Sequence, residues 1–164
     1  MALTPEAGSI RIARGDDVEE IAPLFDAYRQ FYGAASDVPA AQVFLAARIS
    51  RNESRVLIAV VGQGASAIVA GFAQLYFSFS SLSLGTTVIL NDLFVMPEHR
   101  GRGLAGSLVD HAVSQAQKEG AASIQLMTQH RNRTALRLYR SRGFSTDSEF
   151  AHLTLPTMIR GTAE

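Results

Sequence analysis

A run of arginines and glycines between two predicted elements has the composition of an anion-binding loop. It covers residues 95–106 and reads VMPEHRGRGLAG. Free N–H groups at the start of a helix attract anions, glycines allow close backbone approach, and arginines add charge-assisted hydrogen bonds. A loop that merely caps a helix is the alternative. We expect this loop to bind a pyrophosphate.

Gly101, Gly103 and Gly106 also match the spacing G-x-G-x-x-G of dinucleotide-binding proteins. In that fingerprint the glycines follow the strand at once, and an acidic residue about 20 positions later ends the next strand. Here residues 96–100 separate the glycines from the preceding strand, and the next strand ends in Met-Thr-Gln at 127–129. The sequence therefore argues against a dinucleotide site.

The run instead resembles motif A of the GNAT superfamily of acetyl-CoA-dependent N-acetyltransferases. That motif reads Gln/Arg-x-x-Gly-x-Gly/Ala, and Arg100, Gly103 and Ala105 fill its fixed positions. The preceding LNDLFVMP and the later N-x-x-A-x-x-L-Y-x-x-x-G-F, from Asn132 to Phe144, also match the family. The likeness covers residues 88–144 and is greatest to diamine acetyltransferases and the related histone and polyamine acetyltransferases.

The resemblance implies acetyl-CoA as co-substrate. Its pantetheine arm would bond the backbone of Leu93 and Val95 in a splay between the fourth and fifth strands. The N–H groups from Arg100 to Ala105 would hold the pyrophosphate. The cofactor-binding residues so implied are Leu93, Phe94, Val95, Arg100, Gly101, Arg102, Gly103, Leu104, Ala105, Asn132 and Tyr139.

Asn132 and Tyr139 are the candidates on the short helix that follows. They are seven residues apart, which puts them within about 20° of each other around a helix. Asn132 could serve only as the helix N-cap, and Tyr139 could be a core aromatic. In this motif we favour a catalytic Tyr139, because a phenol can donate a hydrogen bond or proton to a departing thiolate.

The position at which the resemblance expects the general base is one at which this chain differs from the family. An alkylammonium with a pKa near 10.4 is neutral only about once in 2,500 at pH 7, so a base or water chain must take its proton. In the diamine acetyltransferases a glutamate stands where Asn91 is here, followed by an aspartate matching Asp92. Asn91 cannot accept that proton and could hold a water, whereas Asp92 could act through a β-bulge or only brace the backbone.

The resemblance places the acceptor pocket near the first interhelical loop and the C-terminal strands. Tyr32, Asp37 and Glu149 are therefore candidate substrate-binding residues. The expected acceptor is a small primary amine or polyamine. The alternatives are a protein N-terminus or lysine, or a CoA-binding regulatory module without turnover. The four histidines lack metal-ligand spacing, so no metal is expected.

The elements that must position these residues form an α/β fold, an α+β mixed sheet. We predict strands over 9–13, 55–61, 67–79, 86–95 and 123–128, and one or two more after Phe144. Helices are predicted from Asp16 to about Tyr28, and over 39–50, 100–118 and 132–142. Gly71 suggests a bulge or close backbone approach. The fold is expected to be GNAT-like, mostly antiparallel, splayed at strands 4 and 5, with about four helices.

The composition limits the remaining possibilities. The 164 residues fit a single domain, 1–164, and 15 basic residues balance 15 acidic ones, so no nucleic-acid partner is expected. There is no cysteine, which excludes a cysteine acyl-enzyme. The N-terminus has no leader pattern and no apolar run reaches about 18 residues, so we expect a cytoplasmic chain without a membrane partner. A homodimer is possible.

Overall fold

A five-stranded open sheet forms the centre of the computed structural model, which describes residues 8–157. The strands lie in sequence order, and they are β1 (Ser9–Ile12), β2 (Ser54–Val61), β3 (Ile68–Ser80), β4 (Gly85–Val95) and β5 (Ser123–Leu126). The first four pair antiparallel, and β5 pairs parallel with β4. This mixed sheet confirms the predicted fold class.

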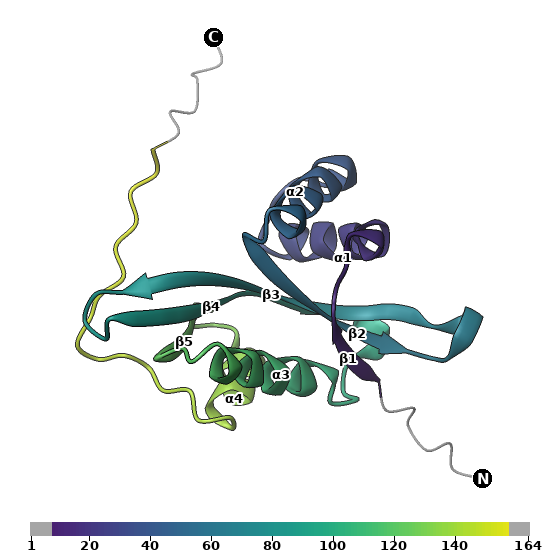
Figure 1. The fold of residues 1–164 in the computed structure, drawn as a ribbon. Helices are drawn as coiled ribbons and strands as arrows, with labels where there is room; N and C mark the ends of the chain where they lie inside the picture. Colours follow the sequence, from purple (N-terminus) through teal and green to yellow (C-terminus); the bar gives the residue numbers. More distant parts are fainter. Residues whose placement is uncertain (1–7, 158–164) are drawn as a thin grey trace.

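Two helices cover each face of the sheet (Figure 1). α1 (Val18–Phe31) and α2 (Val38–Ser50) lie on one face, and α3 (Leu104–Lys118) and α4 (Arg133–Arg140) lie on the other. Buried apolar residues form two clusters that the sheet separates. Phe72 belongs to the cluster under α1 and α2, whereas Leu75 and Leu90 belong to the cluster with α3. Short 3₁₀ turns at Gly15–Asp17, Gly64–Ser66 and Pro97–His99 complete the chain's regular elements.

β4 carries a bulge at Asn91. Gln74 of β3 pairs with Asp92 and Leu75 pairs with Leu90, so Asn91 has no partner on β3. An extra residue in one strand changes which face the following side chains point to. Leu90 therefore packs with the α3 cluster, while Asp92, only two positions on, points to the opposite face with Phe94.

Gly71 of β3 lies at both of the features that were predicted as alternatives, a bulge and a close backbone approach. The pairing with β2 shifts at this point, since Ala59 pairs with Gly71 but Val60 pairs with Val69. A Cβ on Gly71 would also lie 2.7 Å from Phe94 O. A side chain here would push β4 away from β3.

The structure corrects one predicted helix boundary and the strands predicted after Phe144. α3 begins at Leu104 rather than Arg100, because Gly101 (φ +74°) and Gly103 (φ +83°) adopt left-handed conformations that a right-handed helix does not contain. The strands predicted after Phe144 are absent from residues 144–157. That segment (yellow in Figure 1) leaves α4 as an extended stretch that pairs with none of the five strands.

Candidate functional site

β4 and β5 diverge halfway along β4. Their pairing stops at Leu90 and Leu126, but β4 continues to Val95. Backbone groups of successive residues point to alternate edges of a strand, and Met96 N–H donates to Ala70 O on the β3 side at 2.9 Å. The backbone groups of Leu93 and Val95 therefore point to the other edge, where β5 has left. The structure thus contains the predicted splay.

A cavity of about 70 Å³ lies at the point of divergence. Its walls come from α1, β4, α4 and the segment after β5. They are Tyr28, Tyr32, Leu90, Asn91, Leu93, Met127, Thr128, Asn132, Ala135 and Tyr139. The structure therefore brings together five of the residues singled out by sequence. Tyr28 was missed, because its helical spacing with apolar residues is typical of a core side chain.

Tyr139 is a buried wall of this cavity, with 8% of its surface exposed. Its ring packs edge to face with Phe144 at 5.8 Å between centroids. Burial, and to a smaller extent the nearby Tyr32, raise the pKa of Tyr139 to about 12. The hydroxyl therefore keeps its proton at neutral pH and can donate it to a developing anion.

Asn132 combines the two roles considered for it. Its Oδ1 accepts a hydrogen bond from Ala135 N–H at 3.1 Å, as expected of the N-cap of α4. The same side chain lines the cavity. Because Oδ1 carries the cap, the amide nitrogen is the atom left for a ligand.

The loop before α3 has the features of an anion cradle. A Cβ built on Gly101 or Gly103 would meet nothing within 4 Å, so the space beside both glycines is open. Ser107 N–H donates to Gly103 O at 3.0 Å, and helix geometry leaves the three N–H groups before it, at 104–106, without intrahelical acceptors. Gly103 provides no side-chain cap for them. These N–H groups and the helix dipole suit a phosphate.

Arg100 and Gly106 of this loop are involved in contacts within the protein. Arg100 Nε donates to Val95 O at 2.8 Å, and its guanidinium lies 5.6 Å from the centroid of Phe94. Arg100 thus ties the loop to the end of β4. A Cβ on Gly106 would lie 2.0 Å from the guanidinium of Arg142, which also donates to Asp110 at 2.8 Å. Gly106 therefore leaves the space beside α3 that the Arg142 guanidinium occupies.

Asp92 lies behind the cavity, on the α1 and α2 side of the sheet. It is 5% exposed, and Asn91 Nδ2 donates to its Oδ1 at 3.0 Å. Burial raises the pKa of Asp92, while hydrogen bonds from Asn91 and Tyr28 act in the opposite direction. Its partner across β3, Gln74, is fully buried and donates to Tyr76 Oη at 2.7 Å. Asp92 therefore belongs to a buried polar cluster next to the cavity.

Two of the residues predicted to bind substrate lie outside the cavity wall. Asp37 accepts a hydrogen bond from Ala40 N–H at 3.0 Å and so caps α2. Its own N–H donates to the buried Asp26 at 2.8 Å, which fixes the loop between α1 and α2. Glu149 is exposed in the segment after α4. Of the three candidates, Tyr32 alone reaches the cavity.

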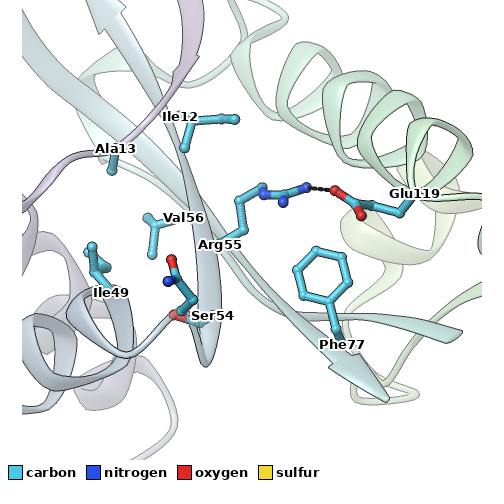
Figure 2. A pocket seen from close by; sticks show the side chains of 9 residues that line it. Ile12, Ala13, Ile49, Ser54, Arg55, Val56, Phe77 and Glu119 are labelled. Carbon is cyan, nitrogen blue, oxygen red and sulfur yellow. Dashed lines mark hydrogen bonds and ion pairs between the residues drawn. The ribbon is translucent and has the colours of Figure 1, made fainter. Parts of the chain in front are cut away.

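A larger cavity, of about 200 Å³, lies at the other end of the sheet. Figure 2 shows it between β2, the end of α2 and the end of α3, with Arg55 of its wall paired to Glu119 at 2.7 Å. Arg55 also donates to Gln115 at 3.1 Å and lies over Phe77. Its charge is thus already matched, and the wall contains none of the glycine loop, β4 or α4. We therefore place the chemistry in the smaller cavity.

Within residues 8–157, no three His, Cys, Asp or Glu side chains gather closely enough to hold a metal ion. Among the helices described, none has the length and apolarity to cross a membrane.

Comparison with known proteins gives consistent matches. The sequence profile of the Acetyltransferase (GNAT) family matches residues 21–144. The Bacillus subtilis (strain 168) protein named "Uncharacterized N-acetyltransferase YhfO" is 44% identical over 147 residues, which cover 90% of this chain and 96% of that protein. The thialysine N-epsilon-acetyltransferase of Mus musculus is 30% identical over 95 residues, covering 57% of this chain and 55% of its own.

A solved structure is similar over nearly the whole fold. The crystal structure of a probable acetyltransferase has a TM-score of 0.86 and 38% identity, covering 92% of this chain and 99% of its own. The range matched by the family profile contains α1, β4, the glycine loop and α4. It therefore contains every element that contributes to the small cavity.

Proposed function

Since the chain belongs to the acetyltransferase (GNAT) family, we propose that it moves an acetyl group from acetyl-CoA directly to a small primary amine. One observation carries the proposal: the edge of β4 left free by β5 runs between the glycine loop and a cavity lined by Tyr139. One end of this path suits a phosphate, and the other has a proton donor. Acetyl-CoA is an extended molecule with a pyrophosphate at one end and a thioester at the other.

The residues present fit acetyl-CoA. The pyrophosphate would sit at the start of α3, on the free N–H groups of Leu104, Ala105 and Gly106. The amide groups of the pantetheine arm would pair with the backbone of Leu93 and Val95, as another strand would. The thioester would then reach Tyr139, which supplies a hydrogen bond or proton as the C–S bond breaks.

The chain's composition favours direct transfer over a cysteine acyl-enzyme. Without cysteine, no thiol can carry the acetyl group between donor and acceptor. The amine nitrogen would attack the thioester carbon while both are held in the cavity, and Tyr139 would assist the departing sulfur. Asn132 would position one of the two substrates through its free amide nitrogen.

The cavity walls favour an acceptor with a single positive charge at the reacting end. Three of the lining residues, Tyr28, Tyr32 and Tyr139, present aromatic rings that can attract a cation. None of the lining residues within the described chain is acidic, whereas a polyamine would need carboxylates for its other charges. The thialysine relative is likewise named for acetylation of one amino group, the ε-nitrogen.

The experiment is an acetyl-CoA consumption assay with a panel of amines. The panel contains thialysine, lysine, a simple alkylamine, spermidine and a peptide with a free N-terminus. We expect turnover of the small primary amines, with kcat/KM for spermidine no higher than for the alkylamine. Preference for the peptide would favour a protein acetyltransferase. Thermal stabilisation by acetyl-CoA with no turnover of any amine would indicate a binding module and overturn the proposed activity.

We also propose that the chain forms a homodimer through the segment after α4. Its side chains Phe150, Leu153 and Leu155 are 70%, 89% and 83% exposed, and β5 is the last strand of the sheet, with one edge unpaired. Exposed apolar side chains and a free strand edge each favour pairing with another chain.

Light scattering after size exclusion should therefore give the mass of a dimer. The double substitution Leu153→Ser and Leu155→Ser should produce a monomer, because it removes the apolar side chains that a second copy would cover. Leu82→Ser is the matched control, since Leu82 is 92% exposed but lies in the turn between β3 and β4. A wild-type monomer would contradict this proposal.

A further inference from the structure

A neutral amine must form in a cavity that has no carboxylate in its wall. Asn91 lines the cavity at the position where the resemblance places the general base, but its amide cannot accept a proton at neutral pH. The nearest carboxylate is Asp92, which the bulge at Asn91 turns to the α1 side of the sheet. A proton can therefore reach Asp92 only through another group.

The side chain of Tyr28 lies between the cavity and Asp92. It lines the cavity from α1, and its hydroxyl lies 3.4 Å from Asn91 O, longer than a good O–H···O bond. The hydroxyl is also close enough to Asp92 for each group to shift the pKa of the other. The hydroxyl hydrogen can rotate between these acceptors. Tyr28 thus lies between the cavity that it lines and the buried carboxylate whose pKa it affects.

Aromatic neighbours hold the Tyr28 ring in place. Ring centroids lie 5.1 Å away in Tyr32, 6.1 Å away in Phe72 and 6.5 Å away in Phe25. The contacts with Tyr32 and Phe72 are edge to face, a favourable arrangement for aromatic pairs. The ring is therefore oriented before any substrate binds, while its hydroxyl stays free to rotate.

Building on the proposed acetyl transfer, we propose that Tyr28 relays the proton of the bound amine to Asp92. An ammonium N–H bond breaks and its proton binds Tyr28 Oη, while the Tyr28 O–H bond breaks and its proton binds the Asp92 carboxylate. Tyr28 is neutral before and after, Asp92 becomes a carboxylic acid, and the amine gains a lone pair. The N–C bond then forms as the C–S bond breaks, Tyr139 gives its proton to the departing sulfur and regains one from the acetylated nitrogen, and Asp92 later returns its proton to water by the reverse path.

The surroundings favour a concerted relay over a tyrosinate intermediate. Burial first, and then Asp92, raise the pKa of Tyr28 well above its usual range, so the phenol does not ionise alone. Burial also raises the pKa of Asp92, which makes it a better proton acceptor than an exposed aspartate. No Lys or Arg of residues 8–157 forms an ion pair with Asp92 that would cancel this effect.

The groups that face Asp92 leave it as the residue of this cluster that titrates on the acid side of the pH profile. Tyr28 approaches from α1 and Tyr76 from β3, and burial raises the pKa of Tyr76 to about 12. The charge of Arg48 on α2 lowers the pKa of Tyr76 to a smaller extent. Gln74 and Asn91 do not titrate. The acid limb of kcat/KM should therefore report Asp92, at a pH above the ordinary pKa of an aspartate.

The test compares Tyr28→Phe, Asp92→Asn and the double variant, using the amine of the panel that wild type acetylates fastest. Each single change should lower kcat/KM by about 10²- to 10³-fold near pH 7, the range of general base catalysis. The loss should shrink to about tenfold or less near pH 10, where the amine supplies its own neutral form. The double variant should be no slower than the slower single variant by more than about twofold, because one path is removed in all three.

Tyr76→Phe is the matched control. Its hydroxyl also lies near Asp92, but Tyr76 does not line the cavity, so the variant should keep the pH profile of wild type. An equal loss at every pH in Tyr28→Phe, or multiplying losses in the double variant, would overturn the relay. Absence of amine turnover in wild type would instead be a failure of the proposed function.

Stability gives a second readout for Asp92. A carboxyl group whose folded-state pKa is raised stabilises the fold while protonated and loses that contribution as the pH rises through the folded pKa. Asp92→Asn should therefore raise Tm at neutral pH, with the difference vanishing below the ordinary pKa of 3.8. A merely bracing Asp92 predicts the opposite, a lower Tm in the variant, and that result together with retained activity would overturn its role as proton acceptor.

Discussion

Gly103→Leu should weaken acetyl-CoA binding by at least about 100-fold while the protein stays folded. Gly103 has φ +83° and precedes the free N–H groups of α3. A leucine would project into the open space beside the loop, where the pyrophosphate is expected, and would strain the left-handed backbone. At a ligand concentration 100 times the wild-type Kd, stabilisation should fall from about 2.7 to about 0.4 kcal/mol. Thermal unfolding with and without acetyl-CoA measures this change.

Gly120→Leu separates strain from binding. Gly120 follows the other end of α3, has φ +64° and, like Gly103, has no atom within 4 Å of a built Cβ. Leucine there should cost about 1–2 kcal/mol in the left-handed region but leave the shift produced by acetyl-CoA intact. If Gly103→Leu is folded and is stabilised by acetyl-CoA as much as wild type, the glycine loop does not hold the pyrophosphate.

Tyr139→Phe should lower kcat by about 10²-fold or more with little change in acetyl-CoA affinity, because the hydroxyl matters most as charge grows on sulfur. Since the pKa of Tyr139 is raised to about 12, the phenol is protonated throughout the working range. The loss should therefore be the same factor from about pH 6 to about pH 9. This distinguishes Tyr139 from Tyr28, whose loss should shrink as the pH rises. Single-turnover kinetics measures the step directly.

Phe144→Leu controls for packing around Tyr139. Phe144 contacts the Tyr139 ring but is not a wall of the cavity, so its substitution disturbs the ring's support and spares the hydroxyl. We expect this variant to retain most of its kcat. Unchanged kcat in Tyr139→Phe, with acetyl transfer shown to be the rate-limiting step, would remove Tyr139 from the mechanism.

The two proposed proton transfers, one through Tyr28 and one from Tyr139, take place on two sides of one cavity. Tyr28 comes from α1 and would take the proton from the amine, whereas Tyr139 comes from α4 and would serve the departing sulfur. Tyr32 lies near both, since it packs against Tyr28 and affects the pKa of Tyr139. Substitutions of Tyr32 should therefore change the pH dependence of both steps.

Features that depend on neighbours in sequence were predictable from the sequence. Asn132 indicated the start of a helix, because caps are built from a few adjacent residues. The glycines at 101 and 103 indicated an anion-binding loop, but the helix was predicted to begin at Arg100, and their left-handed angles delay it to Leu104. The strands and helices followed from their apolar periodicity. The cap role of Asp37 also had a local signal, since Pro39 follows it at the first turn of α2.

Features that depend on pairing between distant segments needed the tertiary structure. The bulge at Asn91 exists only in the register between β4 and β3, and it decides which way Asp92 points. Tyr28 meets Asn91 across 63 positions, so no local pattern could separate it from the core aromatics around it. The segment after Phe144 alternates like a strand but pairs with no strand within residues 8–157, although one edge of β5 is unpaired there. A strand is completed by its partner, which lies outside its own sequence.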